Sequence, residues 1–270
     1  MCRMLYMEAA HAHGHTYRLA RNALQEWSSW NHDGTGVAFY KSDGSLQIVK
    51  AVVSPRKLYK RGVPNAARFI GHVRAATDGS RNDDNVHPFV SCDGKSAFMH
   101  NGVLDDYEEL REELLAKGHK FTSQTDSEVM LHLGEEVGPR NLIAELIKRG
   151  VKGSANWVWM HPDVTYAYSS GSLYLVKNEQ GLMVGLFSDL TFPGARHFKR
   201  RFSLKNGEFM TIQNGVFVRE SIETLPARVF KLEAYYESFY GMGGLTDDLP
   251  PLPNVTYVTS SGITTTFKPQ

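Results

Sequence analysis

Cys2 is the residue whose position most clearly suggests chemistry, because it directly follows the first methionine in the segment "MCRMLYM". A cysteine attacks a carbonyl carbon as its thiolate, and a free thiol with a pKa near 8.5 needs a base or a lowered pKa. If Met1 is removed, the α-amine of Cys2, whose pKa is about 7.7 to 8.0, can accept the thiol proton itself. A small apolar residue at the chain end is the alternative interpretation, so other residues must decide between the two.

Arg74 is a second candidate, in the segment "FIGHVRAAT". Alternating side chains place His72 and Arg74 on the same face of a predicted strand. A guanidinium on a half-buried sheet face can hold a carboxylate through two parallel hydrogen bonds. Taken alone, however, the strand favours a structural salt bridge with one of the many acidic residues.

Asn101 and Gly102 follow an apolar run in "FMHNGV", and the residues after them are predicted to begin a helix. We therefore expect the strand to end at this pair, although Asn-Gly is also typical of a hairpin turn. An asparagine amide and a glycine N–H at such a corner can form an oxyanion hole. Asp126, in "SQTDSEVM", is expected in the first turn of a helix, where a carboxylate interacts favourably with the helix dipole. Each residue has an ordinary structural explanation, and only their combination points to a site.

The surrounding elements indicate sheets covered by helices rather than alternating βαβ units. Residues 16–27 and 105–118 show apolar residues at helical spacing, and a capping box of Thr125 and Glu128 is predicted to open a third helix. Two hairpins are expected, over residues 36–50 and 209–218, and residues 157–187 are predicted to form successive antiparallel strands.

The composition argues against several partners and locations. The 270-residue chain has a formal net charge of +1, which gives no reason to expect nucleic acid or an acidic membrane as a partner. Glu8 interrupts the apolar start, so no signal peptide is expected, and no apolar stretch has the length of a membrane span. Cys2 and Cys92 alone cannot form a disulfide framework. We therefore expect a cytoplasmic protein that binds neither nucleic acid nor membranes.

Several spaced segments resemble, in order and wording, the class II glutamine amidotransferase domain, a member of the N-terminal nucleophile (Ntn) hydrolases. These segments are "MCR", "DGTGVAFY", "HVRAATDG", "NVHPF", "HNGVLDDYEELR" and "TDSEV". The resemblance covers residues 2–217, which we expect to form this domain, and leaves residues 218–270 as a C-terminal extension that packs on the domain or on a partner. Ordered motifs of this kind are far more specific than any one of them alone.

The resemblance implies an α+β fold, a four-layer αββα sandwich of two antiparallel sheets flanked by helices. It implies that Cys2 attacks the side-chain amide of glutamine, forms a γ-glutamyl thioester and releases ammonia. In the pattern of the family, Arg74 holds the substrate α-carboxylate and Asp126 its α-ammonium, while the amide of Asn101 and the N–H of Gly102 hold the oxyanion. Thr77 and His87 would line the same pocket, and no cofactor or metal is implied.

The wording around Arg74 sets this chain apart from amidotransferases that carry a sugar isomerase or phosphoribosyl domain. Those have Trp and His where this chain has Ala75 and Asp78, and "MCR" with "HVRAAT" instead resembles a small stand-alone branch. Three functions therefore stay open. The chain is expected to be a glutaminase that supplies ammonia to a separate synthetase; the alternatives are a hydrolase of γ-glutamyl peptides or thiol adducts, and a non-enzymatic regulatory subunit that keeps the fold.

One further group of residues could bind metal, and the second cysteine also needs an interpretation. His11, His13 and His15 in "HAHGH" have a spacing that would suit three ligands on one strand face, but Gly14 favours a loop and no carboxylate or cysteine is near in sequence. Cys92, in "SCDGK", is expected at a turn without a chemical role. We therefore expect no metal site.

Overall fold

The computed structural model describes residues 2–9, 14–76, 80–178 and 183–227, together with three short strands further on; the side chains of residues 14–16 are not described. The chain forms two compact units, Met1–Leu225 and Pro226–Gln270. Residue 217, where we expected the domain to end, lies inside a strand that pairs within the first unit. The second unit contains β14 (Val229–Phe230), β15 (Thr256–Val258) and β16 (Thr264–Thr266). Their order is β14-β15-β16.

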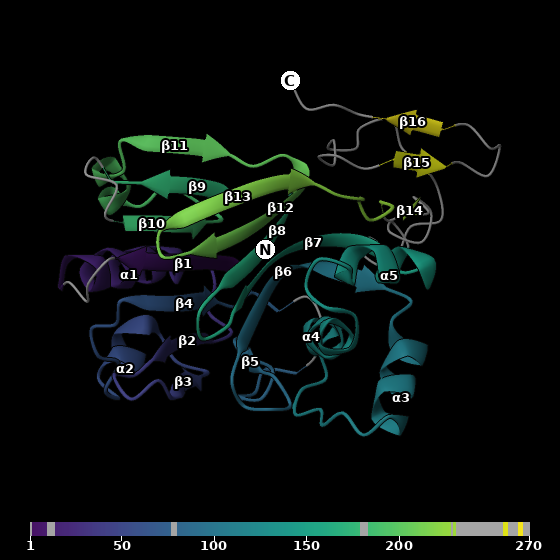
Figure 1. Ribbon diagram of the computed structural model, residues 1–270, viewed down its shortest axis with the longest axis horizontal. Coiled ribbons are helices and arrows are strands. Elements are labelled where there is room, and N and C mark those ends of the chain that lie inside the picture. The colour runs from purple at the N-terminus through teal and green to yellow at the C-terminus, as the bar shows by residue number, and fades with distance from the viewer. Residues whose placement is uncertain are drawn as a thin grey trace, which may run out of the picture. The chain divides into compact units, whose positions relative to one another are not determined.

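Two antiparallel sheets form the centre of the first unit (Figure 1). The seven-stranded sheet has the order β11-β9-β10-β1-β4-β2-β3. Its strands are β1 (Arg3–Ala9), β2 (Thr35–Tyr40), β3 (Leu46–Ala51), β4 (Arg68–Val73), β9 (Tyr174–Lys177), β10 (Met183–Phe187) and β11 (Arg200–Ser203). The six-stranded sheet has the order β13-β12-β8-β7-β6-β5. Its strands are β5 (Phe89–Val90), β6 (Ala97–Asp105), β7 (Lys152–Met160), β8 (Thr165–Ser170), β12 (Asn206–Gln213) and β13 (Val216–Ser221).

Helices cover the outer faces of both sheets. They are α1 (Gly14–Trp27), α2 (Pro55–Tyr59), α3 (Glu108–Ala116), α4 (Asp126–Val137), α5 (Leu142–Lys148) and the 3-10 helix η1 (Pro193–His197). One hydrophobic cluster joins α1 and α2 to the seven-stranded sheet, and another joins α3, α4 and α5 to the six-stranded sheet. A third cluster fills the space between the sheets. The predicted four-layer αββα sandwich is therefore confirmed.

Strand β1 shows how the sequence creates this layering. Met4 and Tyr6 point into the cluster between the sheets, whereas Leu5 and Met7 point toward α1. Successive residues of a strand face opposite sides, so a strand covered on both faces is apolar throughout. This explains the continuous apolar run "MLYM" at the start of the chain.

Several predicted elements are observed, and one local prediction is wrong. Helix α1 buries Leu19, Leu24 and Trp27 on one face, as its spacing predicted. Thr125, however, makes no side-chain bond that caps α4. Glu128 instead accepts hydrogen bonds from the backbone N–H groups of Thr122 and Ser123, because the chain before α4 folds back over that carboxylate.

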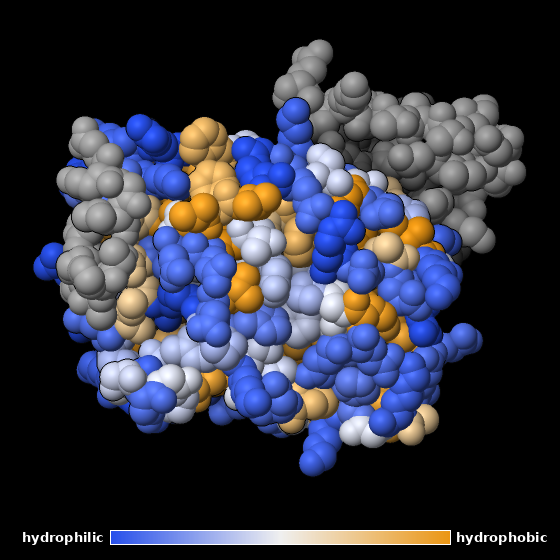
Figure 2. All heavy atoms as spheres, in the orientation of Figure 1, coloured by the Kyte–Doolittle hydropathy of each residue, from blue (hydrophilic) through white to orange (hydrophobic). Residues whose placement is uncertain are grey.

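The surface is mainly hydrophilic on the face shown in Figure 2, where hydrophobic residues form small separate patches. Trp30 is the most exposed large hydrophobic residue in the described part of the chain, with 85% of its surface accessible. Within the same described part, no helix has the combination of length and apolar character that crossing a membrane requires.

Candidate active site

Cys2 lies immediately before β1, and strand pairing places it beside the segment that follows β4. Arg3 is opposite Val73 in the β1–β4 register, so Cys2 lies next to Arg74 and Ala75. The Cys2 thiol donates to the Ala75 carbonyl over 3.2 Å, and its sulfur accepts from the Ala75 N–H over 3.3 Å. The start of the chain is thereby fixed against the loop after β4.

Asn101 comes from the opposite sheet and reaches the same point. Its Nδ2 donates to the Cys2 carbonyl oxygen over 3.1 Å. Its Oδ1 lies 3.0 Å from Nε2 of His72, which is fully buried on β4. Burial lowers the pKa of His72 to about 3, so the ring is neutral at pH 7 and Nε2–H can donate to Oδ1. His72 thereby orients the Asn101 amide so that its NH₂ group faces Cys2.

The strand that carries Asn101 does not end at this residue. β6 continues to Asp105 and pairs with β7 throughout, with Gly102 opposite Ala155. The expected corner after Asn101 is therefore wrong, since backbone pairing extends the strand through Gly102. A Cβ atom on Gly102 would lie 1.9 Å from the Ser154 carbonyl oxygen, so only glycine fits this close pairing.

Asp126 occupies the first turn of α4, as predicted, and also contacts β6. Its Oδ2 accepts a hydrogen bond from the Leu104 N–H over 2.8 Å, and its Oδ1 accepts one from the Ser127 hydroxyl over 3.1 Å. Ser127 in turn bonds to His100 over 2.9 Å. These contacts position the carboxylate two residues beyond Gly102 along the edge of the site.

Arg74 is buried, with 3% of its surface accessible, and follows directly after β4. Its backbone N–H donates to the Gly34 carbonyl and its carbonyl accepts from the Asp33 N–H. Its Nη1 donates to the Ser80 carbonyl oxygen over 3.1 Å. The segment of Asp33 and Gly34 therefore holds the Arg74 backbone in place.

Several of these groups affect the pKa of the Cys2 thiol. Burial raises the pKa of the Cys2 thiol; the Ala75 N–H and the Arg74 charge oppose this rise, and the Asp126 charge adds to it. Both charged side chains therefore lie near enough to Cys2 to act on its thiol. Because burial disfavours the thiolate, a base would have to remove the thiol proton before this sulfur could act as a nucleophile.

His87 is also buried, and its ring packs against that of His72 with 4.2 Å between the centroids and 36° between the ring planes. Burial holds the pKa of His87 well below its usual value. Neither ring nitrogen has a hydrogen-bond partner within the described residues. His87 thus supports His72 by packing against its ring. Thr77, and the imidazoles of His11, His13 and His15, lie outside the residues and side chains that the structure describes.

His72 and Ala75 are contributors to which the sequence analysis gave no role. His72 shares a strand face with Arg74, and that alternation was the available signal. The part played by Ala75 uses only its backbone, so its residue type carried no signal.

Comparisons with known proteins indicate the family of this domain. The sequence profile of the glutamine amidotransferase domain matches residues 53–150. The glutamine–fructose-6-phosphate aminotransferase (isomerizing) of Thermotoga maritima is 32% identical over 209 residues, which cover 72% of this chain and 33% of the relative. That of Thermococcus kodakarensis is 36% identical over 165 residues, which cover 58% of this chain and 27% of the relative. The chain therefore spans about a third of the length of these curated relatives.

The fold is shared with a solved amidotransferase. The glutamine phosphoribosylpyrophosphate amidotransferase of Bacillus subtilis superimposes with a TM-score of 0.64 at 21% identity, over 87% of this chain and 52% of the other. The αββα layers, the ordered motifs and the matching profile agree with one another. The chain therefore contains a class II glutamine amidotransferase domain with the Ntn-hydrolase fold.

Proposed function

We propose that this chain hydrolyses the side-chain amide of glutamine, with Cys2 as the nucleophile. After removal of Met1, the α-amine of Cys2 takes the thiol proton and the sulfur attacks the amide carbon. The tetrahedral intermediate collapses as the amine passes that proton to the leaving nitrogen, giving a γ-glutamyl thioester and ammonia. Water then attacks the thioester and releases glutamate, which restores the thiol.

The oxyanion of each tetrahedral intermediate would be held by donors from β6. The Asn101 amide already faces Cys2, and the Gly102 N–H follows it along the same strand. Donors held in place before the reaction stabilise developing charge without reorganising, and each is typically worth about 3 kcal/mol. His72 would act through Asn101, as a positioning residue.

The amino-acid head of the substrate needs one cation and one anion held apart. Arg74 would hold the α-carboxylate, Asp126 the α-ammonium, and Thr77 and His87 would line the pocket. Fixing both charges leaves the side-chain amide free to reach the sulfur in one orientation. Arg74 and Asp126 both act electrostatically on Cys2, which supports this placement.

The observation that carries the proposal is the contact of Cys2, at the start of the chain, with both the Ala75 backbone and the Asn101 amide. We expect the intact mass of the purified protein to lack Met1 and a glutamine-like electrophile to label Cys2. The Cys92→Ser variant should be labelled equally well. Retained Met1, or labelling at Cys92 instead, would contradict the proposal.

A larger γ-glutamyl substrate is a second candidate, favoured by a cavity of about 420 Å³ beside Cys2. Arg3 and Ala75, which flank the nucleophile, line it together with Trp27, Trp30 and Asp189. Such a volume suits a small-molecule group beyond the amide nitrogen. Ammonia release from glutamine and amine release from γ-glutamyl peptides, measured side by side as kcat/KM, distinguish the two.

Transfer of ammonia to a separate synthetase is the remaining part of the proposal. It is supported by relatives that are named as aminotransferases and whose chains continue beyond the matched part. An ammonia supplier should turn over slowly alone and faster with its partner. Full activity alone on a γ-glutamyl peptide would favour the hydrolase instead.

A further inference from the structure

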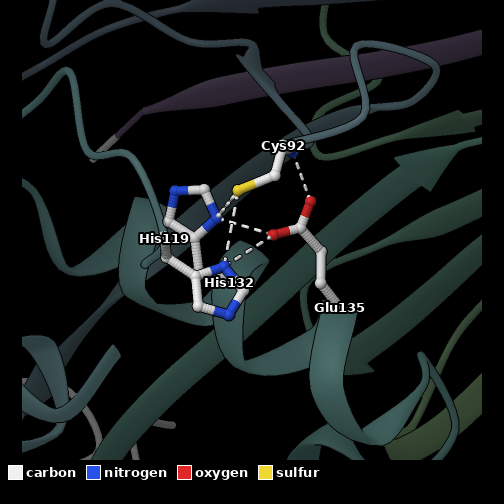
Figure 3. Close-up of side chains that lie close together, drawn as sticks. All are labelled: Cys92, His119, His132 and Glu135. Carbon is white, nitrogen blue, oxygen red and sulfur yellow. Dashed lines mark hydrogen bonds and ion pairs between the residues drawn. The ribbon is translucent and has the colours of Figure 1, made fainter. Parts of the chain in front are cut away.

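A second cluster of reactive side chains lies away from Cys2, beside the C-terminal half of α4. Cys92 is in the turn after β5, His119 follows α3, and His132 and Glu135 are one turn apart on α4. Figure 3 shows the four side chains pointing toward one another. One potential ligand atom from each lies within 4.8 Å of all the others. The function proposed above does not use these residues.

The distances within this cluster suit a tetrahedral metal site. The Cys92 sulfur lies 3.4 Å from Nδ1 of His119 and 3.5 Å from Nδ1 of His132. Oε2 of Glu135 lies 3.1 Å from the first of these nitrogens and 2.7 Å from the second. Metal–ligand bonds of about 2.0 to 2.3 Å give tetrahedron edges of roughly 3.3 to 3.8 Å. The two sulfur–nitrogen distances fall in this range, whereas the two distances to Oε2 of Glu135 must lengthen, by about 0.2 and 0.6 Å.

Outer contacts orient two of the four ligands. Nε2 of His119 lies 3.4 Å from Glu136, whereas Nε2 of His132 is 4.0 Å from Glu128 and has no hydrogen-bond partner within the described residues. The remaining oxygen of Glu135 accepts the Cys92 N–H, which leaves Oε2 facing the cluster. Metal-binding histidines usually present their other nitrogen to a carboxylate in this way.

Burial distinguishes this cluster from an ordinary group of surface charges. Only 1% of the His132 side chain is accessible, compared with 14% for His119 and 16% for Glu135. The Nδ1 atoms of both imidazoles lie within hydrogen-bond distance of Oε2 of Glu135, and the Cys92 sulfur lies within 3.5 Å of both nitrogens. A cation at the centre would satisfy all four donor atoms at once.

We propose that Cys92, His119, His132 and Glu135 bind one zinc ion through Sγ, the two Nδ1 atoms and Oε2. Borderline-soft Zn²⁺ accepts this mixture of sulfur, nitrogen and oxygen ligands, and the thiol proton leaves to solvent as the metal binds. Four protein ligands complete a tetrahedron, so the site is structural rather than catalytic. From the sequence we expected no metal site and no chemical role for Cys92, because these ligands are distributed over three separate segments.

The zinc would connect the turn after β5, the loop after α3 and the middle of α4. Asp126 lies at the first turn of the same helix. The metal therefore fixes the helix that carries the proposed ammonium-binding carboxylate, without touching the substrate.

Metal content of the full-length protein tests the proposal. Protein purified without chelator and passed through gel filtration should carry about one zinc per chain, whereas the Cys92→Ser and Glu135→Gln variants should carry less than about a tenth of that. The Cys2→Ala variant is the matched control, because it removes the other cysteine and should keep its zinc. Wild-type protein that stays free of zinc after incubation with excess zinc and gel filtration would overturn the proposal.

Cobalt substitution gives a second test that does not depend on stability. Co²⁺ added to metal-free protein should produce a sulfur-to-cobalt charge-transfer band and the intense visible bands of tetrahedral coordination. Both should persist in the Cys2→Ala variant, and the charge-transfer band should disappear in Cys92→Ser. A charge-transfer band that depends on Cys2, or cobalt spectra typical of octahedral coordination, would overturn the assignment.

Discussion

The two cysteines of this chain lie in opposite chemical environments. The sulfur of Cys2 is buried and hydrogen-bonds to backbone groups of Ala75, whereas the sulfur of Cys92 lies between two imidazoles and next to a carboxylate. Cys92 has neighbouring bases in abundance, yet its neighbours converge as ligands around one point. In the proposed mechanism, Cys2 uses its own α-amine as the base.

The comparison teaches that a cysteine is defined by the geometry of its neighbours more than by their number. A nucleophile needs an open approach for a carbonyl carbon and hydrogen-bond donors beyond it, the role proposed for Asn101 and Gly102. A metal ligand needs other donor atoms at a fixed distance from a common centre. Helix α4 serves both regions, with Asp126 at its first turn and His132 and Glu135 further along.

The most severe way to break the comparison is Cys2→Ala. Because the proposed mechanism has no other nucleophile, we expect glutaminase activity to fall by at least roughly 10⁴-fold. Ammonia release measures this loss, and circular dichroism together with zinc content checks that fold and metal are retained. Ammonia release close to the wild-type rate would refute the nucleophile.

Asn101→Ala should have the next largest effect. Loss of one oxyanion donor is expected to lower kcat by about 10² to 10³-fold with little change in KM. His72→Leu should lower kcat by about 10 to 100-fold through a misplaced Asn101 amide. If His72→Leu lowered kcat while Asn101→Ala did not, the proposed chain of contacts from His72 to the oxyanion would be wrong.

Arg74→Lys tests the site at its substrate-binding end. A lysine keeps the charge but loses the two parallel hydrogen bonds, so KM for glutamine should rise by roughly tenfold or more while kcat changes less. Steady-state kinetics with glutamine measure both constants. An unchanged KM would show that Arg74 has a structural role only.

Acid should destabilise the region around Cys2 through its buried imidazoles. Burial lowers the pKa of His72 to about 3, so below pH 6.5 the unfolded chain binds a proton that the folded chain does not. The free energy of unfolding therefore decreases as the pH is lowered through this window, by about 2 kcal/mol for such a histidine between pH 6.5 and 5. Urea unfolding at the two pH values measures the change, and His72→Gln should reduce it.

Cys92→Ser should have the smallest effect on catalysis. We expect kcat within about threefold of wild type, because Cys92 contacts neither the substrate nor Cys2, while the melting temperature falls by several degrees as zinc is lost. Calorimetry with and without a chelator measures the change. If the chelator lowered the melting temperature of Cys92→Ser as much as that of wild type, the thermal effect would not come from metal bound at this cluster.

The sequence was enough to predict the layered fold and to select a set of candidate site residues. Period-2 and helical spacing identified the strands and helices, since burial of one face leaves a periodic pattern. Cys2, Arg74, Asn101, Gly102 and Asp126 could be selected because their order along the chain matches a family. Their grouping around Cys2 in the structure follows from strand pairing, and their catalytic roles stay predictions.

Tertiary structure alone decided where strands pair and which distant side chains meet. Residues 157–187 were expected as successive antiparallel strands, but they divide between the two sheets, with β7 and β8 in one and β9 and β10 in the other. Local sequence does not encode such partners, because either sheet satisfies the same period of two. The Cys92 cluster was invisible for the same reason: its ligands come from segments that only packing brings within 4.8 Å.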